Sequence, residues 1–337
     1  MKSDADPIRS EPIRTDPIQA GSDVEQTPLP MAPLNRFVGS VPTIPSQAVV
    51  ADVREESPII RHRPVKPIIR RPDSRARVIK LKSPRELALM REAGRVVALA
   101  LAEVKRLAVP GVSTAELDDA VARIFEQHGA TPLFKGVPNA QEGQPPFPAV
   151  ICASVNEQVV HGIPNRRPLQ IGDIISIDTG CRLNGWCGDS AVTLPIGEVR
   201  PELRKLLEVT EETLNIAIRA IGRCEYWSQV ATLMESFVKS QGMHVIEKFV
   251  GHGIGQAMHE EPQVPNFMSR ALKQHDIRLE PGLVLAIEPM VALGTKDVRV
   301  LKDAWTVETK DRRASAHFEH TVAITADGPE ILTRLND

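Results

Sequence analysis

The chain has 337 residues, of which 42% are hydrophobic and 25% are charged, so it can bury a sizeable core in one large domain or two small ones. Its net charge of −2 indicates neither nucleic acid nor a membrane surface as a partner, and we expect no DNA binding. No run of 18 apolar residues occurs, and the opening MKSDADPIRS has no apolar stretch, so we expect neither a membrane span nor a secretory signal.

The first 77 residues form a proline-rich segment unlike the rest of the chain. Residues 1–80 hold 12 of the 28 prolines, and the segment opens with the repeat DPIRS, EPIRT, DPIQA. Proline removes backbone donors and forces its neighbours into extended conformations, so a packed domain is not expected there. We predict a disordered tail over residues 1–77 and one folded domain over residues 78–337.

A basic run spans residues 61–82, with nine Lys or Arg and one acid, Asp73. Such a run suits non-specific contact with the phosphates of ribosomal RNA. A solvated basic linker is the simpler interpretation and the one that we favour. No aromatic residue is interleaved with these charges, so base stacking is not predicted.

Two pairs of helices are predicted from capping signals and from apolar residues at helical spacing. The first pair covers residues 83–109 and 113–129, and its second member opens on a capping box of Ser113 and Glu116. The second pair covers residues 201–222 and 225–242. Apolar, β-rich stretches follow each pair, at 149–155, 173–178 and 189–195, and then at 244–250, 283–289, 305–309 and 320–325. This repeated order predicts an α/β (α+β) domain with two pseudo-symmetric halves.

The stretch DIISIDTGCRLNGWCGDSAVTL is predicted to form a β-hairpin with Asn184 and Gly185 as its turn. A two-residue turn pairs Asp178 with Ala191, which places Asp189 on the same face as Asp178, as its diagonal neighbour. Their neighbours are largely apolar, and buried like charges are expensive without a cation or a proton. The hairpin therefore favours metal binding over a pair of surface acids.

Four cysteines are present: Cys152, Cys181, Cys187 and Cys224. None forms a CxxC pair, so a zinc finger is not expected. Cys181 and Cys187 flank the predicted turn, and a disulfide between them is an alternative. Because nothing places the chain in an oxidising compartment, we predict reduced thiols and a cytoplasmic protein.

Three further candidate ligands follow in the chain. Glu288 ends the apolar run GLVLAI, Glu319 lies in AHFEHTVAIT, and His252 lies between the glycines of VGHGIG. Taken alone, Glu319 fits a half-buried polar face and His252 fits a structural histidine. Four carboxylates and one imidazole suit a pair of divalent cations that share bridging carboxylates, a device that activates water. The metals compatible with these ligands are Mn, Fe(II), Co and Zn.

The strings around these residues, together with NEQVVHGIP, GHGIGQAMHEEPQVPNF, LAIEPMV, KDAWTVETKD and SAHFEHT, resemble successive blocks of the type I methionine aminopeptidases. The resemblance covers residues 78–337 nearly end to end. It implies the pita-bread fold, with two pseudo-symmetric halves around a dinuclear metal centre. It also implies a hydrolase that removes the initiator methionine of nascent polypeptides when the second residue is small, and we expect it to act as a monomer.

The resemblance also implies residue roles. Asp178 would chelate one metal and His252 the other, Asp189 and Glu319 would bridge the pair, and Glu288 would bind metal and relay a proton. Two histidines outside the metal shell, His161 and His259, would contact the substrate and its developing oxyanion. The methionine pocket would consist of Phe147, Cys152, Met258 and Trp305, and Asn156 and Ser315 would hold a monovalent cation.

Some features depart from the family pattern. Met258 stands where many relatives carry an aromatic residue, and the loop over residues 134–148 is longer than in compact bacterial relatives. The proline-rich tail has no counterpart in the minimal enzyme. Two alternatives stay open: another pita-bread hydrolase, such as an X-Pro aminopeptidase, prolidase or creatinase, and an inactive relative that binds RNA or protein.

Overall fold

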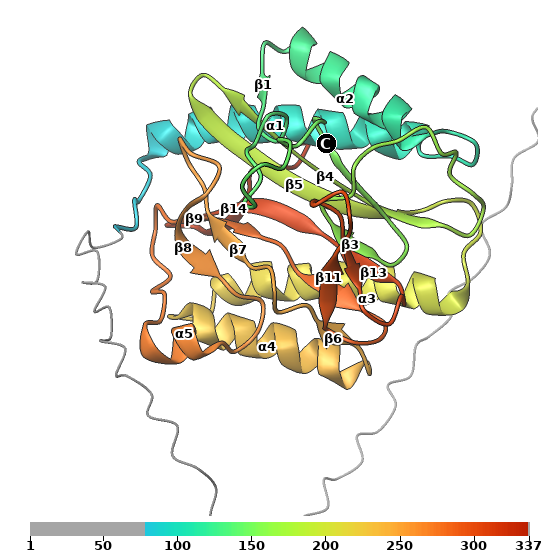
Figure 1. Cartoon of the computed structure of the whole chain (residues 1–337). Helices are drawn as coiled ribbons and strands as arrows, with labels where there is room; N and C mark the ends of the chain where they lie inside the picture. The colour runs from blue at the N-terminus through green and yellow to red at the C-terminus, as the bar shows by residue number, and fades with distance from the viewer. Residues whose placement is uncertain (1–77, 336–337) are drawn as a thin grey trace, which may run out of the picture. The chain divides into compact units, whose positions relative to one another are not determined.

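The computed structural model describes residues 78–335, which fold into a mixed α/β architecture (Figure 1). The tail predicted over residues 1–77 lies outside the described residues. The helices are α1 (Pro84–Leu107), α2 (Thr114–Gln127), α3 (Pro201–Ile221), α4 (Trp227–Ser240) and the short α5 (Arg270–Gln274). The order of the two helix pairs confirms the mixed α/β fold expected from the sequence.

A nine-stranded antiparallel sheet forms the centre of the described part. Its main path runs β1-β4-β5-β14-β9-β7-β8, while β2 pairs with β4 and β15 pairs with β14. The strands are β1 (Thr131–Pro132), β2 (Cys152–Val155), β4 (Ile174–Leu183), β5 (Trp186–Pro195), β7 (Gly251–Gly253), β8 (Glu260–Val264), β9 (Val284–Ile287), β14 (Glu319–Thr325) and β15 (Gly328–Ile331).

Two three-stranded sheets complete the β-structure of the described residues. One has the order β13-β10-β6 and the other the order β11-β12-β3. Their strands are β3 (Gln158–Val160), β6 (His244–Val245), β10 (Met290–Ala292), β11 (Val298–Val300), β12 (Val307–Thr309) and β13 (Ser315–His317).

The register of the β4–β5 hairpin is the predicted one. Leu183 pairs with Trp186, and Asp178 pairs with Ala191. Asn184 and Gly185 have φ values of 51° and 84°, the left-handed conformations that a two-residue hairpin turn requires at both positions. The local turn chemistry therefore determines which residues of the hairpin share a face.

The helices cover the sheet from two sides of its centre. Helix α1 packs against β4, β5 and α2, whereas α3 packs against α4 and also contacts β13 and β14. In Figure 1, α1 and α2 lie along one side of the central strands and α3 and α4 along the other. The predicted capping box of Ser113 and Glu116 forms at α2, and Ser83 and Glu86 form a second one at α1.

Two local expectations differ from the structure. The apolar stretch 244–250 yields only the short strand β6, because Glu247 and Lys248 are exposed and Lys248 begins a bend. Helix α5 was not predicted, since five residues are too few to show helical periodicity. Within residues 78–335, no helix has the length and apolar character that crossing a membrane requires.

The end of the basic run has a structural role. Residues 61–77 lie outside the described residues. The Lys82 ammonium is buried and contacts the Glu260 carboxylate at 2.9 Å, joining the segment before α1 to β8. Lys82 is therefore occupied within the fold and is not free to contact RNA.

Candidate metal centre

The five predicted ligands come from five neighbouring strands of the large sheet. The order β4-β5-β14-β9-β7 brings together segments that are far apart in the sequence. Ala191 pairs with both Asp178 and Glu319, so these side chains share one face. In the order of the strands, the ligands are Asp178 on β4, Asp189 on β5, Glu319 on β14, Glu288 directly after β9, and His252 on β7.

The ligand atoms lie close together and several have no partner. One ligand atom from each of Asp189, His252 and Glu319 lies within 4.8 Å of the other two. Glu288 Oε1 is 3.7 Å from Nε2 of His252. Among residues 78–335, no hydrogen-bond donor reaches Oδ1 of Asp178, Oδ1 of Asp189 or Oε1 of Glu319, although all three are buried. Buried polar atoms normally have partners, and the carboxylate oxygens fit hard divalent cations as the missing ones.

The electrostatics of the metal-free centre are unfavourable for four ionised acids. Burial, together with the charges of neighbouring acids, raises the pKa of Asp178, Glu288 and Glu319 well above their ordinary values. Burial also raises the pKa of Asp189 to about 7. Divalent cations would offset this repulsion, because an opposite charge nearby favours the ionised form.

The ring of His252 is oriented as a nitrogen ligand requires. Its Nδ1 lies 2.9 Å from the carbonyl oxygen of Gly253, which leaves Nε2 facing Glu288. Burial, then the neighbouring His259, lowers the pKa of His252 to about 4, so the ring is neutral at neutral pH. A neutral imidazole with one nitrogen bound to a carbonyl presents the other as a ligand.

The two histidines expected outside the metal shell line the same cavity, which has a volume of about 400 Å³. The rings of His259 and His252 have centroids 4.3 Å apart. Burial, then His259, lowers the pKa of His161 to about 4. His161 adopts a φ of 59°, an uncommon left-handed conformation that directs its ring toward Phe249 and Trp305.

An apolar cluster forms one wall of this cavity. It contains the four predicted pocket residues Phe147, Cys152, Met258 and Trp305, together with Phe134. The rings of Phe147 and Trp305 meet edge to face with centroids 5.2 Å apart. The indole N–H of Trp305 donates to the Pro145 carbonyl at 3.0 Å, which fixes the ring.

The loop over residues 134–148 contributes to the rim of the cavity. Its base is closed by the bond from the Phe147 N–H to the Val137 carbonyl, at 2.9 Å. The Asn139 amide donates to the Ala304 carbonyl at 2.9 Å, which ties the loop to the residue before Trp305. Phe134 and Val137 thereby become part of the lining, in addition to the pocket residues named from the sequence.

Asn156 and Ser315 lie outside this cavity but contact each other. The Ser315 N–H donates to the Asn156 carbonyl at 2.9 Å. The Asn156 side chain bridges Asp173 and Ile174, and the Ser315 hydroxyl donates to the Val291 carbonyl. The structure thus brings the two residues together, and each side chain already has protein partners.

Two residues near the centre were not assigned a role from the sequence. Nε2 of His317 is 4.0 Å from carboxylate oxygens of both Glu288 and Glu319, and neither ring nitrogen has a hydrogen-bond partner. The amide of Asn266 donates to the backbone carbonyl of Glu288 at 3.0 Å. The only sequence signal for His317 is its position two residues before Glu319, and Asn266 had none.

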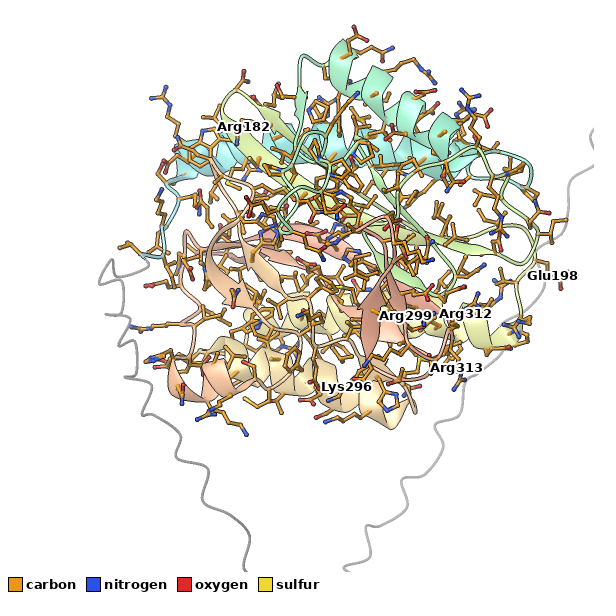
Figure 2. The ribbon with its side chains drawn as sticks, in the orientation of Figure 1. Arg182, Glu198, Lys296, Arg299, Arg312 and Arg313 are labelled. Carbon is orange, nitrogen blue, oxygen red and sulfur yellow. The ribbon has the colours of Figure 1, made fainter. Side chains whose placement is uncertain are left out.

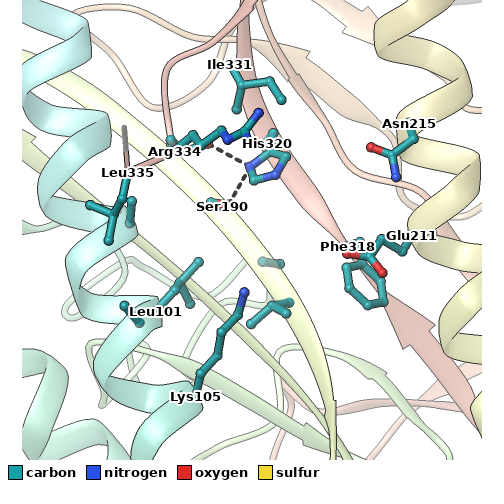
Figure 3. Close-up of a pocket in the computed structure, with 15 residues that line it drawn as sticks. Leu101, Lys105, Ser190, Glu211, Asn215, Phe318, His320, Ile331, Arg334 and Leu335 are labelled. Carbon is teal, nitrogen blue, oxygen red and sulfur yellow. Dashed lines mark hydrogen bonds between the residues drawn. The ribbon is translucent and has the colours of Figure 1, made fainter. Parts of the chain in front are cut away.

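A second cavity, of about 450 Å³, lies on the opposite face of the same strands (Figure 3). Ser190 and His320, the residues after Asp189 and Glu319, line it. The Ser190 hydroxyl donates to the Glu319 carbonyl at 2.5 Å, and Nδ1 of His320 lies 3.0 Å from the Thr333 hydroxyl. The polar groups on the walls of this second cavity are therefore hydrogen-bonded. In the first cavity, which contains the candidate ligands and is called the metal-ligand cavity below, several carboxylate oxygens have no donor among the described residues.

Comparisons with known proteins agree with this geometry. The family model described as metallopeptidase family M24 matches residues 88–326. The chain is 48% identical over 254 residues to "Methionine aminopeptidase 1" of Bacillus subtilis, covering 75% of this chain and 98% of that protein. The crystal structure of a methionine aminopeptidase from Thermotoga maritima superposes with a TM-score of 0.71 at 40% identity, covering 77% of this chain and 100% of that one.

A more distant likeness concerns the fold alone. A prolidase from Pyrococcus furiosus superposes with a TM-score of 0.58 at 19% identity. The match covers 76% of this chain and 66% of the prolidase. Together these structures support the pita-bread fold expected for the described part of the chain.

Proposed function

The chain belongs to the methionine aminopeptidases of metallopeptidase family M24, and on that premise we propose how its residues hydrolyse the first peptide bond of a polypeptide. It is a metallo-aminopeptidase that removes initiator methionine and acts on the N-termini of nascent chains. The observation that carries the assignment of residues is the set of three buried carboxylate oxygens without donors, on Asp178, Asp189 and Glu319. Because nascent chains are made in the cytoplasm, we propose that the enzyme acts there.

We propose that two divalent ions occupy the centre. Asp178, Asp189, His252, Glu288 and Glu319 would hold them, with Asp189 and Glu319 as the bridging pair because they lie on adjacent strands in the middle of the set. When bound, the ions activate water and stabilise the negative charge that develops on the carbonyl oxygen. Mn, Fe(II), Co and Zn all accept this oxygen and nitrogen ligand set.

The proton transfer is assigned to Glu288, whose carboxylate faces the cavity. A carboxylate beside the activated water can accept its proton and pass it to the leaving amine. His161 and His259 face the same space as neutral rings, and a neutral imidazole can donate one N–H to a developing oxyanion. The two rings would therefore orient the substrate carbonyl.

The apolar wall would receive the methionine side chain. Phe147, Cys152, Met258 and Trp305 supply a surface without charge, and Met258 adapts to a flexible thioether. Phe134 and Val137 also line the cavity and would limit the space that is left for the second residue. Asn156 and Ser315 stay candidates for a monovalent cation.

Ribosome contact through residues 61–82 and the monomeric state stay predictions. Of this run, Lys82 is engaged by Glu260, so any contact would depend on the other basic residues of the run. Co-sedimentation with ribosomes tests it with the full chain and with a chain that starts at Val78. Equal binding by both, insensitive to salt, would remove a role for the basic run.

The assay of the proposed function uses metal-free protein reconstituted with Mn, Fe(II), Co or Zn. Its substrates are Met-Ala-Ser and an X-Pro peptide, and the Glu288→Gln variant is assayed in parallel. We expect methionine release that requires metal and is lost in Glu288→Gln. Cleavage confined to the X-Pro peptide would instead assign the chain to the proline-specific enzymes, and no turnover with any metal would favour a binding role.

A matched control separates the loss of a centre carboxylate from the loss of any carboxylate. Glu330→Gln removes an acid that pairs with Arg91 at 2.6 Å on the surface. We expect Glu330→Gln to keep full activity with the same metal, because exposed ion pairs contribute little to stability.

A further inference from the structure

Arg182 is the one cation among the residues that line the metal-ligand cavity. It lies near the turn between β4 and β5, and its side chain is exposed (Figure 2). The function proposed above uses the acids, the histidines and the apolar wall, and assigns nothing to this guanidinium.

The alternation of side chains along β4 places Arg182 on the same face of the sheet as the candidate metal ligands. Asp178, Gly180 and Arg182 alternate along β4, so their positions face one side of the sheet. The register pairs Arg182 with Cys187, while Cys181 on the other face contacts the Ala93 carbonyl of α1. Arg182 is thus part of the substrate side of the sheet and not of the helix side.

Between Asp178 and Arg182, this face of β4 carries no side chain. A Cβ built at Gly180 would lie 2.9 Å from Oδ1 of Asp189, so a larger residue would intrude on the ligand. Gly180 therefore contributes only backbone between the ligands and Arg182, and the Asp189 carboxylate lies directly beside it. An extended peptide that passes this carboxylate meets no further side chain of β4 before Arg182.

The charge of Arg182 has no acidic partner among residues 78–335. The Glu260 carboxylate, near Cys187, is bound by Lys82 at 2.9 Å. The residue opposite Arg182 is Cys187, which is not an acid. Four carboxylates and two divalent ions would cancel in formal charge, which leaves Arg182 as the net charge of the loaded cavity.

We propose that Arg182 is a specificity residue that favours nascent chains with Asp or Glu a few positions after the methionine. This inference rests on the proposed function, since it needs the scissile bond at the metal centre. Four residues of strand span about 13 Å, which corresponds to about four residues of an extended substrate. Arg182 then meets the third to fifth residue, and its planar guanidinium matches a carboxylate.

The test uses pentapeptides that begin Met-Ala and carry Ser at the remaining positions. In each of two series, the third, fourth or fifth Ser is replaced by Asp or by Lys. We measure kcat and KM for the metal-loaded full chain, for Arg182→Gln and for Arg182→Glu. Arg204→Gln, an exposed arginine on α3 that is absent from the cavity lining, is the matched control.

At one of the three positions, we expect Asp to be preferred over Lys by about two- to fivefold in kcat/KM, the range of an exposed ion pair. The preference should lie mainly in KM, because the ion pair forms equally in the ground state and the transition state. It should shrink at high salt, disappear in Arg182→Gln and reverse in Arg182→Glu. Arg204→Gln should keep it.

The peptide with Ser at the third, fourth and fifth positions distinguishes a failure of the Arg182 inference from a failure of the proposed function. Equal turnover of this peptide by every variant, with no preference between Asp and Lys at any position, would overturn the inference and leave the proposed function intact. A preference that persists in Arg182→Glu would also overturn it. No methionine release from any peptide would overturn both.

Discussion

Adjacent residues on β5 and β14 face two different environments. Asp189 and Glu319 face the metal-ligand cavity, and each has a buried oxygen without a donor. Ser190 and His320 face the opposite cavity, where they contact each other and the Thr333 and Glu319 oxygens. Both faces bury polar groups, and only the second satisfies them from within the chain. Polarity and burial are common to both faces. What distinguishes the face that needs a ligand is that its buried polar atoms lack hydrogen-bond partners within the described chain.

The largest effect on activity is expected when one carboxylate charge is removed from the face that carries the candidate metal ligands. Asp189→Asn and Glu319→Gln keep the shape of the side chain but take away a carboxylate that we propose bridges the two ions. We expect kcat/KM to fall by more than about 100-fold, since even the residues that support metal ligands are worth 10- to 100-fold. Metal content after dialysis, measured by elemental analysis, should fall in parallel. Full metal content with full activity would contradict the assignment of these ligands.

His317 belongs to the same face, between Glu288 and Glu319, and its replacement should have an intermediate effect. We expect His317→Ala to lower kcat/KM by about 10- to 100-fold, because the buried ring packs between the two carboxylates, with Nε2 4.0 Å from an oxygen of each. His317→Gln should recover part of the activity, since the amide can still donate to a carboxylate. Unchanged kcat/KM in His317→Ala would mean that the ring only fills space.

The two faces should also respond to pH with opposite sign in the metal-free protein. On the face of the sheet that carries the candidate metal ligands, here called the front face, the pKa values of Asp178, Glu288 and Glu319 are raised. The folded chain therefore binds more protons than the unfolded one. Stability therefore falls as the pH rises. On the opposite, or back, face, burial and then the charges of Lys105 and Arg334 lower the pKa of His320 to about 4. The contribution of His320 to the free energy of unfolding is therefore lost as the pH falls below 6.5.

Other buried histidines share the sign of His320, and their contribution is complete above their ordinary pKa of about 6.5. From pH 6.5 to about 7.5, below the range in which unfolded thiols ionise, the acids dominate, and we expect the metal-free protein to lose on the order of 1–3 kcal/mol. Urea unfolding measures this slope. Added metal, or the Glu319→Gln substitution, should flatten it, and a flat profile in the unmodified metal-free protein would refute the account.

The smallest effect is expected on the satisfied face. Ser190→Ala removes the hydroxyl that donates to the Glu319 carbonyl, and one such hydrogen bond contributes about 1 kcal/mol. We expect a loss of that size in the free energy of unfolding, with kcat/KM reduced less than in any front-face variant. An activity loss as large as that of Asp189→Asn would show that the two faces are not separable.

The sequence predicted those parts of the site that local chemistry determines. The Asn184-Gly185 turn sets the hairpin register, and the register sets the shared face of Asp178 and Asp189. Which strand follows β5 in the sheet depends on long-range packing, and no local pattern indicates that β14 inserts between β5 and β9. The resemblance to a known family supplied the convergence of Glu288, Glu319 and His252 that the residue pattern alone left open.

The residues that were not found have no periodic signal. Asn266 lies in a loop and acts through the backbone carbonyl of Glu288. In the sequence, Lys82 is one more cation of a basic run, and its ion pair with Glu260 is seen only in the structure. In both cases the partner is distant in the sequence, so composition and spacing carry no information about the contact.

The position of β14 also determines when the enzyme becomes competent during its own synthesis. This strand, Glu319–Thr325, fills the middle of the sheet, between strands that are made earlier. Chains fold from the N-terminus as they emerge, so β5 and β9 must wait for a strand that is translated after both of them. A ribosome-bound intermediate thus carries Asp178, Asp189, His252 and Glu288 but lacks Glu319. Activity would switch on in one late step, once this strand has left the exit tunnel.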